Sequence, residues 1–300
     1  MFAESEKSPE ELWQTGAGSK KMSDFVEKVA QNLVLLILII TAIALGAAAY
    51  AQELTILHLN DTHSHIDPQR SGDYKGRGGV IEQAAYIDSV RCAEGRRNVL
   101  LVHAGDFSQG TSYFTELDGD IEINVLNALK FDVVTLGNHE FDNGIPELAR
   151  RLQSLKADVV CSNYDFAATP LHKLVKPYTI IRKAGKKIGF IGLLTDIMQV
   201  VDRDIAKTLQ YQDPVPVVNE LAAFLKDEKD CDMVICLSHL GYGEDKDLAS
   251  RTEGIDVIVG GHSHTLLHKK QVVRNLDGED VIVVQNWKWG LNAGHLTIDF

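Results

Sequence analysis

Five short polar motifs, four of which directly follow an apolar run, constrain the fold of this chain more than any other feature. The apolar runs are rich in β-branched side chains, which is typical of buried parallel strands. In an open α/β sheet, ligands bind in the crevice at the carboxyl ends of the strands. We therefore expect the motifs to converge on one edge of one sheet. They are Asp61-Thr62-His63, Gly105-Asp106, Gly137-Asn138-His139-Glu140, Ser238-His239 and Gly261-His262-Ser263-His264.

Strand-like runs alternate with helical patterns from residue 52 onward, which predicts a layered α/β fold of parallel strands closed by antiparallel ones. The segments 178–182 and 187–193 flank Ala184-Gly185-Lys186 and predict a hairpin. The last two predicted strands, 281–285 and 296–300, are expected to be antiparallel. No linker rich in proline or serine divides residues 52–300, so they form one predicted domain. The predicted helices are 79–90, 119–130, one beginning at 145, and 215–225.

The formal net charge of -12 disfavours nucleic acid as a partner, because phosphates seek lysine and arginine. It does not disfavour phosphate-bearing small molecules at a metal site, where bound ions set the local charge. The four cysteines have no zinc-finger spacing, and a disulfide framework would need denser cysteine usage.

The first 51 residues are expected to lie outside the fold. Residues 1–32 form a polar extension, and residues 33–49 are apolar and uncharged. They lead into Ala49-Tyr50-Ala51, a signal-peptidase pattern, so cleavage would leave Gln52 as the new amino terminus. Because the polar extension is long for a signal peptide, Met22 is a candidate start. Residues 33–49 also approach the lower limit of about 17 residues for a membrane anchor. An uncleaved anchor and a buried helix of the domain are therefore the alternatives to cleavage. Both the cleaved signal peptide and the uncleaved anchor would place the domain at the periplasm or cell surface.

The motifs contain the residue types of a dinuclear metal site. Histidine with carboxylate suits Zn, Mn, Fe or Co, and two-metal hydrolytic sites hold their ions roughly 3.5–4 Å apart. Asp61 and His63 stand two residues apart just after a strand, and His262 and His264 repeat that spacing. Glycines precede the motifs and are expected to permit tight turns there: Gly105, Gly137, Gly260 and Gly261.

These motifs, with Asn60 preceding Asp61, resemble the signature of the calcineurin-like metallophosphoesterases. The segment Asn138-His139-Glu140-Phe141-Asp142-Asn143-Gly144 is similar to the 5′-nucleotidase and UDP-sugar hydrolase family within them. The resemblance covers about residues 54–300 and implies an αββα sandwich with a dinuclear metal site at the strand carboxyl ends.

The resemblance implies a role for each motif residue. Asp106 would bridge two divalent ions; one would be held by Asp61, His63 and His264, the other by Asn138, His239 and His262. The ions would supply a hydroxide of lowered pKa and neutralise the phosphoryl oxygens. His139 would protonate the leaving oxygen or stabilise the transition state, oriented by Asp142 three residues later. Asn138 and His139 would also contact the substrate.

Other polar and aromatic residues are expected to have structural roles. Glu140 is expected to support its loop rather than bind metal, and His65 to lie behind the ligands. Trp287 and Trp289 could stack a base, but packing at the core or sheet edge is favoured. The histidines with no assigned role are His58, His103, His172, His268 and His295.

The activity implied is an exported phosphomonoesterase acting on 5′-nucleotides. A phosphodiesterase for 2′,3′-cyclic nucleotides, or a pyrophosphohydrolase for UDP-sugars or dinucleotides, is the alternative enzyme. A metal-binding subunit that works with a separate substrate-binding protein is the alternative of a different class. Typical members of the family carry a second, carboxyl-terminal domain that grips the nucleotide. This chain ends where that domain would begin, so either a separate protein supplies it or the catalytic domain works alone with weak selectivity.

Overall fold

The computed structural model describes residues 17–48 and 53–300, and the chain divides into two compact units, residues 1–51 and 52–300. The described part of the first unit is a single helix, α2 (Ala17–Ala48). Its apolar side chains from Leu33 to Ile40 are exposed. Within the two described ranges, no helix combines the length and apolar character needed to cross a bilayer. The predicted cleavage site after Ala51 lies outside the described residues.

The second unit is built on two six-stranded mixed sheets. The first sheet has the order β14-β1-β2-β3-β4-β6, and the second has the order β12-β13-β11-β10-β8-β7. A two-stranded ribbon, β5 (Tyr164–Asp165) with β9 (Gln210–Tyr211), stands apart from both. The strands of the two large sheets are β1 (Glu53–Leu59), β2 (Val99–Ala104), β3 (Val133–Thr135), β4 (Asp158–Val160), β6 (Val175–Lys176), β7 (Tyr178–Lys183), β8 (Lys186–Leu194), β10 (Met233–His239), β11 (Val257–Gly260), β12 (Gln271–Arg274), β13 (Asp280–Gln285) and β14 (Gly294–Asp299).

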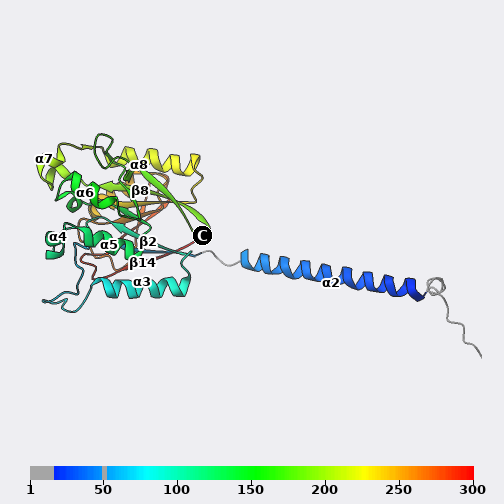
Figure 1. Ribbon diagram of the computed structural model, residues 1–300. Coiled ribbons are helices and arrows are strands. Elements are labelled where there is room, and N and C mark those ends of the chain that lie inside the picture. The colour runs from blue at the N-terminus through cyan, green and yellow to red at the C-terminus, as the bar shows by residue number, and fades with distance from the viewer. Residues whose placement is uncertain (1–16, 49–52) are drawn as a thin grey trace, which may run out of the picture. The chain divides into compact units, whose positions relative to one another are not determined.

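Helices cover the outer face of each sheet, and Figure 1 shows α3 and α8 on opposite sides of the unit. The helical segments are α3 (Val80–Glu94), α4 (Ser112–Leu117), α5 (Asp120–Leu129), the 3₁₀ turn η1 (Asn138–Phe141), α6 (Ile145–Leu152), η2 (Ile197–Gln199), α7 (Arg203–Ala206), α8 (Pro214–Ala223), the π turn η3 (Phe224–Glu228) and α9 (Tyr242–Arg251). The predicted αββα sandwich is confirmed.

Alternation along the strands sorts side chains between the layers. In β1, Leu54 and Ile56 face the core between the two sheets, whereas Leu57 and Leu59 face the core under the first sheet's helices. A third core lies between the second sheet and its helices. A strand that is buried on both faces has a continuous apolar sequence. The apolar runs therefore predict where the strands lie in the chain, but not which of the two sheets each strand joins.

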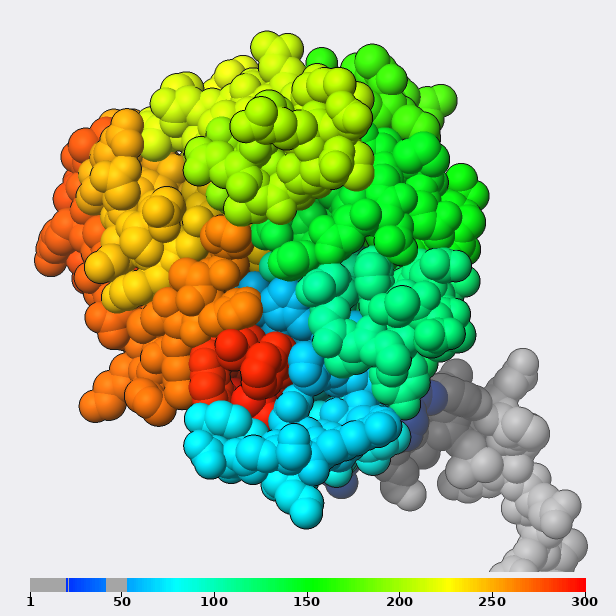
Figure 2. All heavy atoms as spheres, turned by 90° about the vertical axis from the view of Figure 1, so that its left-hand side faces the viewer, coloured from blue at the N-terminus to red at the C-terminus, as the bar shows by residue number. Residues whose placement is uncertain are grey.

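The prediction that the polar motifs meet at one edge of one sheet is wrong. β1, β2 and β3 belong to the first sheet, and β10 and β11 belong to the second. The motifs therefore converge from the carboxyl ends of two facing sheets. Figure 2 shows a face on which the blue, green and orange segments of the chain surround a central hollow.

The predictions for individual elements largely agree with the structure. β7 and β8 form the predicted hairpin, with Lys183 opposite Lys186. The predicted helices match α3, α5, α6 and α8, although α8 ends in the π turn. Of the last two predicted strands, β14 is antiparallel to its partner β1, whereas β13 is antiparallel to β12 and parallel to β11. All four cysteines are free.

Candidate metal centre

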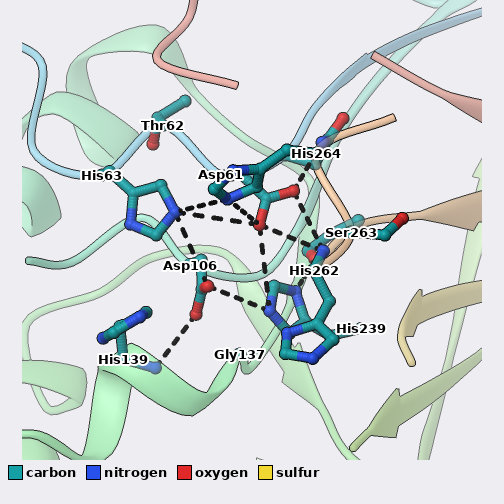
Figure 3. Close-up of polar contacts among 12 residues, drawn as sticks. Asp61, Thr62, His63, Asp106, Gly137, His139, His239, His262, Ser263 and His264 are labelled. Carbon is teal, nitrogen blue, oxygen red and sulfur yellow. Dashed lines mark hydrogen bonds and ion pairs between the residues drawn. The ribbon is translucent and has the colours of Figure 1, made fainter. Parts of the chain in front are cut away.

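One group of metal-ligating side chains joins the two sheets across the ends of β1 and β11. Asp61 and His63 follow β1, and His264 follows β11. The Nε2 atoms of His63 and His264 lie 3.0 Å apart, and His264 Nε2 lies 3.5 Å from Asp61 Oδ1 (Figure 3). One donor atom from each of the three residues lies within 4.8 Å of the other two. The group therefore offers two imidazoles and a carboxylate to one ion.

A second group contains Asp106 after β2, His239 at the end of β10 and His262 after β11. Asp106 Oδ2 lies 3.1 Å from His239 Nε2 and 3.8 Å from His63 Nε2, so its carboxylate stands between the two groups. His239 Nδ1 donates to the carbonyl oxygen of Ala104 at 2.7 Å, so a bound ion would take Nε2 in place of a proton. That Nε2 is buried and makes no well-aligned hydrogen bond, although Asp106 Oδ2 is close to it.

Asn138 supplies a further unsatisfied atom. It begins η1 and is nearly fully buried, yet its Oδ1 has no hydrogen-bond partner. The next residue reaches the same centre, because the backbone N–H of His139 donates to Asp106 Oδ1 at 3.0 Å. A buried amide oxygen without a partner costs about 1–3 kcal/mol unless something else satisfies it. An oxygen ligand for a cation is the role that fits this residue.

The charge states at the centre suit a cation. Burial lowers the pKa of His63 to about 4 and so keeps the neutral imidazole that binds metals. Burial also lowers the pKa of His239, but the negative charges of Asp106 and Asp61 outweigh burial and raise that pKa to about 10. Two buried carboxylates thus call for positive charge here, which divalent ions supply when bound.

Five of the seven proposed ligands have a backbone φ in the left-handed region, which side-chain-bearing residues seldom adopt. Such conformations cost about 1–3 kcal/mol each and gather at functional sites. They turn successive side chains of each loop toward the same point. The φ values are 49° at Asp61, 47° at His63, 56° at Asp106, 72° at His262 and 50° at His264.

The expectation that glycines provide the tight turns is only partly right. Gly105 has a φ of 83°, as expected, but Gly137 has a φ of -104°. Gly137 is required for space, because a Cβ there would overlap the carboxylate and backbone of Asp106. Gly261 is similarly enclosed by the carbonyl of Ala104 and the ring of His239.

His139 and Asp142 make the predicted contact. His139 Nδ1 donates to Asp142 Oδ2 at 2.9 Å, across the 3₁₀ turn η1. This hydrogen bond raises the pKa of His139 above its ordinary value and leaves Nε2 free. The ring lies beside the first group, with 5.3 Å between the centroids of His139 and His63. His139 is therefore positioned to exchange a proton with a molecule at the centre.

Glu140 supports the loops, as expected. Its carboxylate accepts hydrogen bonds from the backbone N–H groups of Gly137 (2.6 Å), Asp106 (2.9 Å) and Ser108 (3.0 Å). A residue that sequence reasoning missed lies beneath it: the buried guanidinium of Arg151 donates to the Glu140 carbonyl and to Ser108 Oγ. Nothing in the pattern of α6 distinguishes Arg151 from an exposed arginine.

Asn60 is a second missed residue. Its Nδ2 donates to Asp61 Oδ2 and to the Trp287 carbonyl, both at 2.6 Å, and its Oδ1 accepts from Asn286 N–H at 2.9 Å. The Trp289 N–H donates to the carbonyl of Asp61 at 2.7 Å. The two tryptophans therefore lie in a loop that holds the ligand loop, rather than in a core or sheet edge. Membership of the quoted motif was the available signal for Asn60.

Several of the remaining histidines contact other side chains of the fold. His65 stacks on Trp289, and His103 Nε2 lies 3.1 Å from Thr62 Oγ1. His295 lies 3.0 Å from the Tyr86 hydroxyl. Within residues 17–48 and 53–300, the metal-ligating groups include none of His58, His65, His103, His172, His268 and His295.

Two facing mixed sheets with a histidine- and carboxylate-rich centre at their shared edge define a metal-dependent α/β enzyme. A family model described as calcineurin-like phosphoesterase matches residues 54–266. The chain belongs to this family and is a hydrolase of the class that uses divalent metals.

The comparisons also find more specific relatives. The solved structure of a 5′-nucleotidase precursor from Thermus thermophilus is 37% identical, with a TM-score of 0.76 over 83% of this chain and 51% of that one. The NAD 5′-nucleotidase of Haemophilus influenzae is 32% identical over 88% of this chain and 47% of its own length. A snake venom 5′-nucleotidase of Crotalus adamanteus is 33% identical over 86% of this chain and 47% of its own length. The chain spans about half the length of these relatives.

Proposed function

We propose that the chain is a phosphomonoesterase that hydrolyses 5′-nucleotides at a centre of two divalent ions. Asp106 would bridge them, and the two candidate groups, the second completed by Asn138, would hold one ion each. The observation that carries this proposal is the position of the Asp106 carboxylate, 3.1 Å from His239 and 3.8 Å from His63. The names of the relatives support nucleotides as the substrate class.

When bound, the ions supply Lewis acidity, which lowers the pKa of water and neutralises phosphoryl charge. The protein's own groups supply the proton. A water oxygen bonds to phosphorus and loses a proton to solvent, the bond from phosphorus to the ester oxygen breaks, and that oxygen takes a proton from His139 Nε2. His139 then regains a proton from solvent. Asp142 holds the opposite ring nitrogen and favours the protonated ring before transfer. Asn138 and His139 would contact the phosphoryl group from η1.

The full chain loaded with Mn²⁺ or Zn²⁺ should release inorganic phosphate from AMP. His139→Ala should keep its metal and lose about 10²–10⁴-fold in kcat, since general acid catalysis contributes that much. Asp106→Ala should lose both metal and activity. His172→Ala, outside the candidate groups, is the matched control and should match wild type. Full activity in His139→Ala would refute its role.

A second enzymatic reading is hydrolysis of a pyrophosphate bond in a dinucleotide or UDP-sugar, or of a 2′,3′-cyclic nucleotide. The relative named NAD 5′-nucleotidase favours including NAD in the substrate panel. A metal-binding subunit that depends on a separate substrate-binding protein predicts bound metal with no turnover. No hydrolysis of any phosphoester by the metal-loaded chain would favour that reading over both enzymatic ones.

We further propose that residues 33–51 direct export and that residues 52–300 act outside the cytoplasm, with residues 1–32 as a polar extension. The support is the uncharged apolar segment, whose side chains from Leu33 to Ile40 are exposed in α2, followed by Ala49-Tyr50-Ala51. The mass of the protein recovered from a secreting host tests this. Cleavage after Ala51 gives a chain that begins at Gln52, whereas an intact chain in the membrane fraction would rule out cleavage in favour of an anchor. An intact chain in the cytoplasm would contradict export.

A further inference from the structure

A groove of about 650 Å³ opens beside the proposed metal ligand His262. Its walls come from the carboxyl ends of three neighbouring parallel strands, since they follow β8, β10 and β11. The start of α8 and the ribbon strand β9 complete it. In Figure 2 the yellow-green, yellow and orange segments of the chain border one another next to the central hollow. The groove therefore continues the same edge that carries the metal centre.

The wall is fastened to the metal-binding loop. The N–H of Tyr242, at the start of α9, donates to Ser263 Oγ at 3.0 Å. That hydroxyl in turn donates to Gln285 Oε1 at 3.0 Å. Ser263 lines the groove and separates the proposed ligands His262 and His264. A molecule held at the ions by its phosphoryl group has this groove within reach.

The lining combines apolar surface with negative charge. Four carboxylates face the groove and only one guanidinium, that of Arg251, which is paired with Asp247 at 2.7 Å. Val200 and the ring of Tyr211 contribute exposed apolar surface. The volume is within the range of pockets that enclose drug-sized ligands. The acidic side chains are Asp196, Asp213, Glu244 and Asp247.

We propose that this groove receives the leaving group of the phosphomonoester, and that it selects a neutral, hydroxyl-bearing group of nucleoside size. This inference rests on the proposed function. The carboxylates accept hydrogen bonds from hydroxyl groups, while Tyr211 and Val200 pack against a ring. Further phosphates on the leaving group would bring negative charge toward the carboxylates, so monophosphates are preferred over diphosphates.

The tryptophan pair is a poorer place for a ring. Trp289 already stacks on His65, with 4.9 Å between centroids and 20° between planes. Lys288 Nζ lies over the same indole, 4.3 Å from its centroid. Trp287 carries an edge contact from Tyr74 and binds Asn60 through its carbonyl. Both indoles therefore already contact rings or charged groups of this chain, whereas Tyr211 has one edge contact, from Tyr164, and lines the groove.

The charge of the groove is tested by the ratio of kcat/KM for AMP to that for ADP. In Asp196→Asn/Glu244→Gln this ratio should fall roughly tenfold, because two repulsive charges are removed. The change to asparagine keeps the oxygen that caps η2. The matched control Asp277→Asn/Glu279→Gln removes two charges near the amino end of β13, outside the groove, and should leave the ratio unchanged. An unchanged ratio in the groove variant would overturn charge selection.

Adenosine, the leaving group alone, tests occupancy without turnover. Its Kd for the full, metal-loaded chain, measured by NMR titration, should rise about fivefold or more in Tyr211→Ala, through loss of the stacked ring. Tyr86→Ala is the control, since Tyr86 and Tyr211 are each 38% exposed but Tyr86 lies outside the groove. Absence of adenosine binding, or equal affinity in wild type and Tyr211→Ala, would refute the subsite. Because binding needs no hydrolysis, an inactive chain that binds adenosine in the groove would contradict only the proposed function.

Discussion

At the scale of single residues, the centre depends on two features. Several of its residues have backbone angles that residues with side chains rarely adopt, and glycines leave space that a side chain would fill. Asp61 and Asp106 both have left-handed φ angles, and each carboxylate accepts from one backbone N–H group, that of His262 and that of His139 respectively. His262 N–H donates to both oxygens of Asp61 at 3.0 Å. The geometry of the proposed ligands therefore depends on backbone groups of neighbouring loops as well as on the ligand side chains.

Gly137→Ala should weaken metal binding by about 10–100-fold, because the added methyl group displaces the Asp106 carboxylate. Titration with Mn²⁺ against a chelator measures this affinity. Gly243→Ala is the control, because a Cβ there meets no atom within 4 Å and it lies in α9. Unchanged affinity in Gly137→Ala would show that the carboxylate does not need this position.

At the scale of elements, η1 connects the candidate metal centre to His139, the proposed proton donor. It presents Asn138 and His139 on consecutive residues, and Glu140 turns back to tie its start to the loop after β2. Arg151 from α6 holds the same turn from below. One short 3₁₀ turn thus places a proposed ligand and the proposed acid, because buried side chains satisfy its free N–H groups.

Glu140→Gln should lower the free energy of unfolding by about 1–3 kcal/mol. The glutamine NH₂ group would face backbone N–H groups from which the Glu140 carboxylate now accepts hydrogen bonds. Urea unfolding measures the loss. The control, Glu147→Gln, removes only an exposed ion pair with Arg150 and should change stability by less than about 0.5 kcal/mol. Equal stability of the two variants would mean that Glu140 does not hold the turn.

At the scale of the whole molecule, the centre joins two sheets that pack on each other mainly through an apolar core, with polar contacts such as Asn163 to Leu194 at the ends of β4 and β8. Any ion held there would bind the folded state alone and stabilise it. Wild type with metal at 100 times its Kd should gain about 2.7 kcal/mol, or roughly 5–10 °C in Tm. Calorimetry before and after chelation checks this. Asp106→Ala should show no such shift, and a chelator-insensitive Tm in wild type would argue against resident ions.

A second prediction for the whole molecule concerns pH. Asp245 is fully buried, and burial raises its pKa from 3.8 to about 8, with only the Ser238 hydroxyl bonded to it. The folded state therefore holds a proton that the unfolded state releases. The contribution of Asp245 to the free energy of unfolding is therefore greatest below about pH 4. It falls between about pH 4 and pH 8, by up to about 1.4 kcal/mol per pH unit.

Asp245→Asn cannot titrate, so its free energy of unfolding should decline less than that of wild type between pH 5 and pH 8. Urea unfolding of both proteins with chelator present makes the comparison free of metal effects. If the free energies of unfolding of the two proteins changed with pH in parallel, Asp245 would not titrate between pH 5 and pH 8 in the folded state, which would contradict its raised pKa.

Much of the local structure could be predicted from the sequence. The β7–β8 hairpin, the strands before each motif and the contact between His139 and Asp142 depend on residues near one another in the chain. The assignment of the motifs to one sheet failed because an apolar run specifies a buried strand and not its partner. Arg151 and the loop at 286–290 were missed for the same reason, since their contacts span distant segments.

The sequence alone predicted the chemistry of the candidate site, because carboxylates, an amide and imidazoles follow directly after buried strands. Glycines stand at positions where these groups leave no room for a side chain. Only the tertiary structure decided that these groups come from two facing sheets, that Asn60 ties the Asp61 loop to residues 286 and 287, and that an acidic groove lies beside His262. Periodicity records which face of a strand is buried. The partner that buries it is selected by packing between segments more than 200 residues apart, which no local pattern encodes.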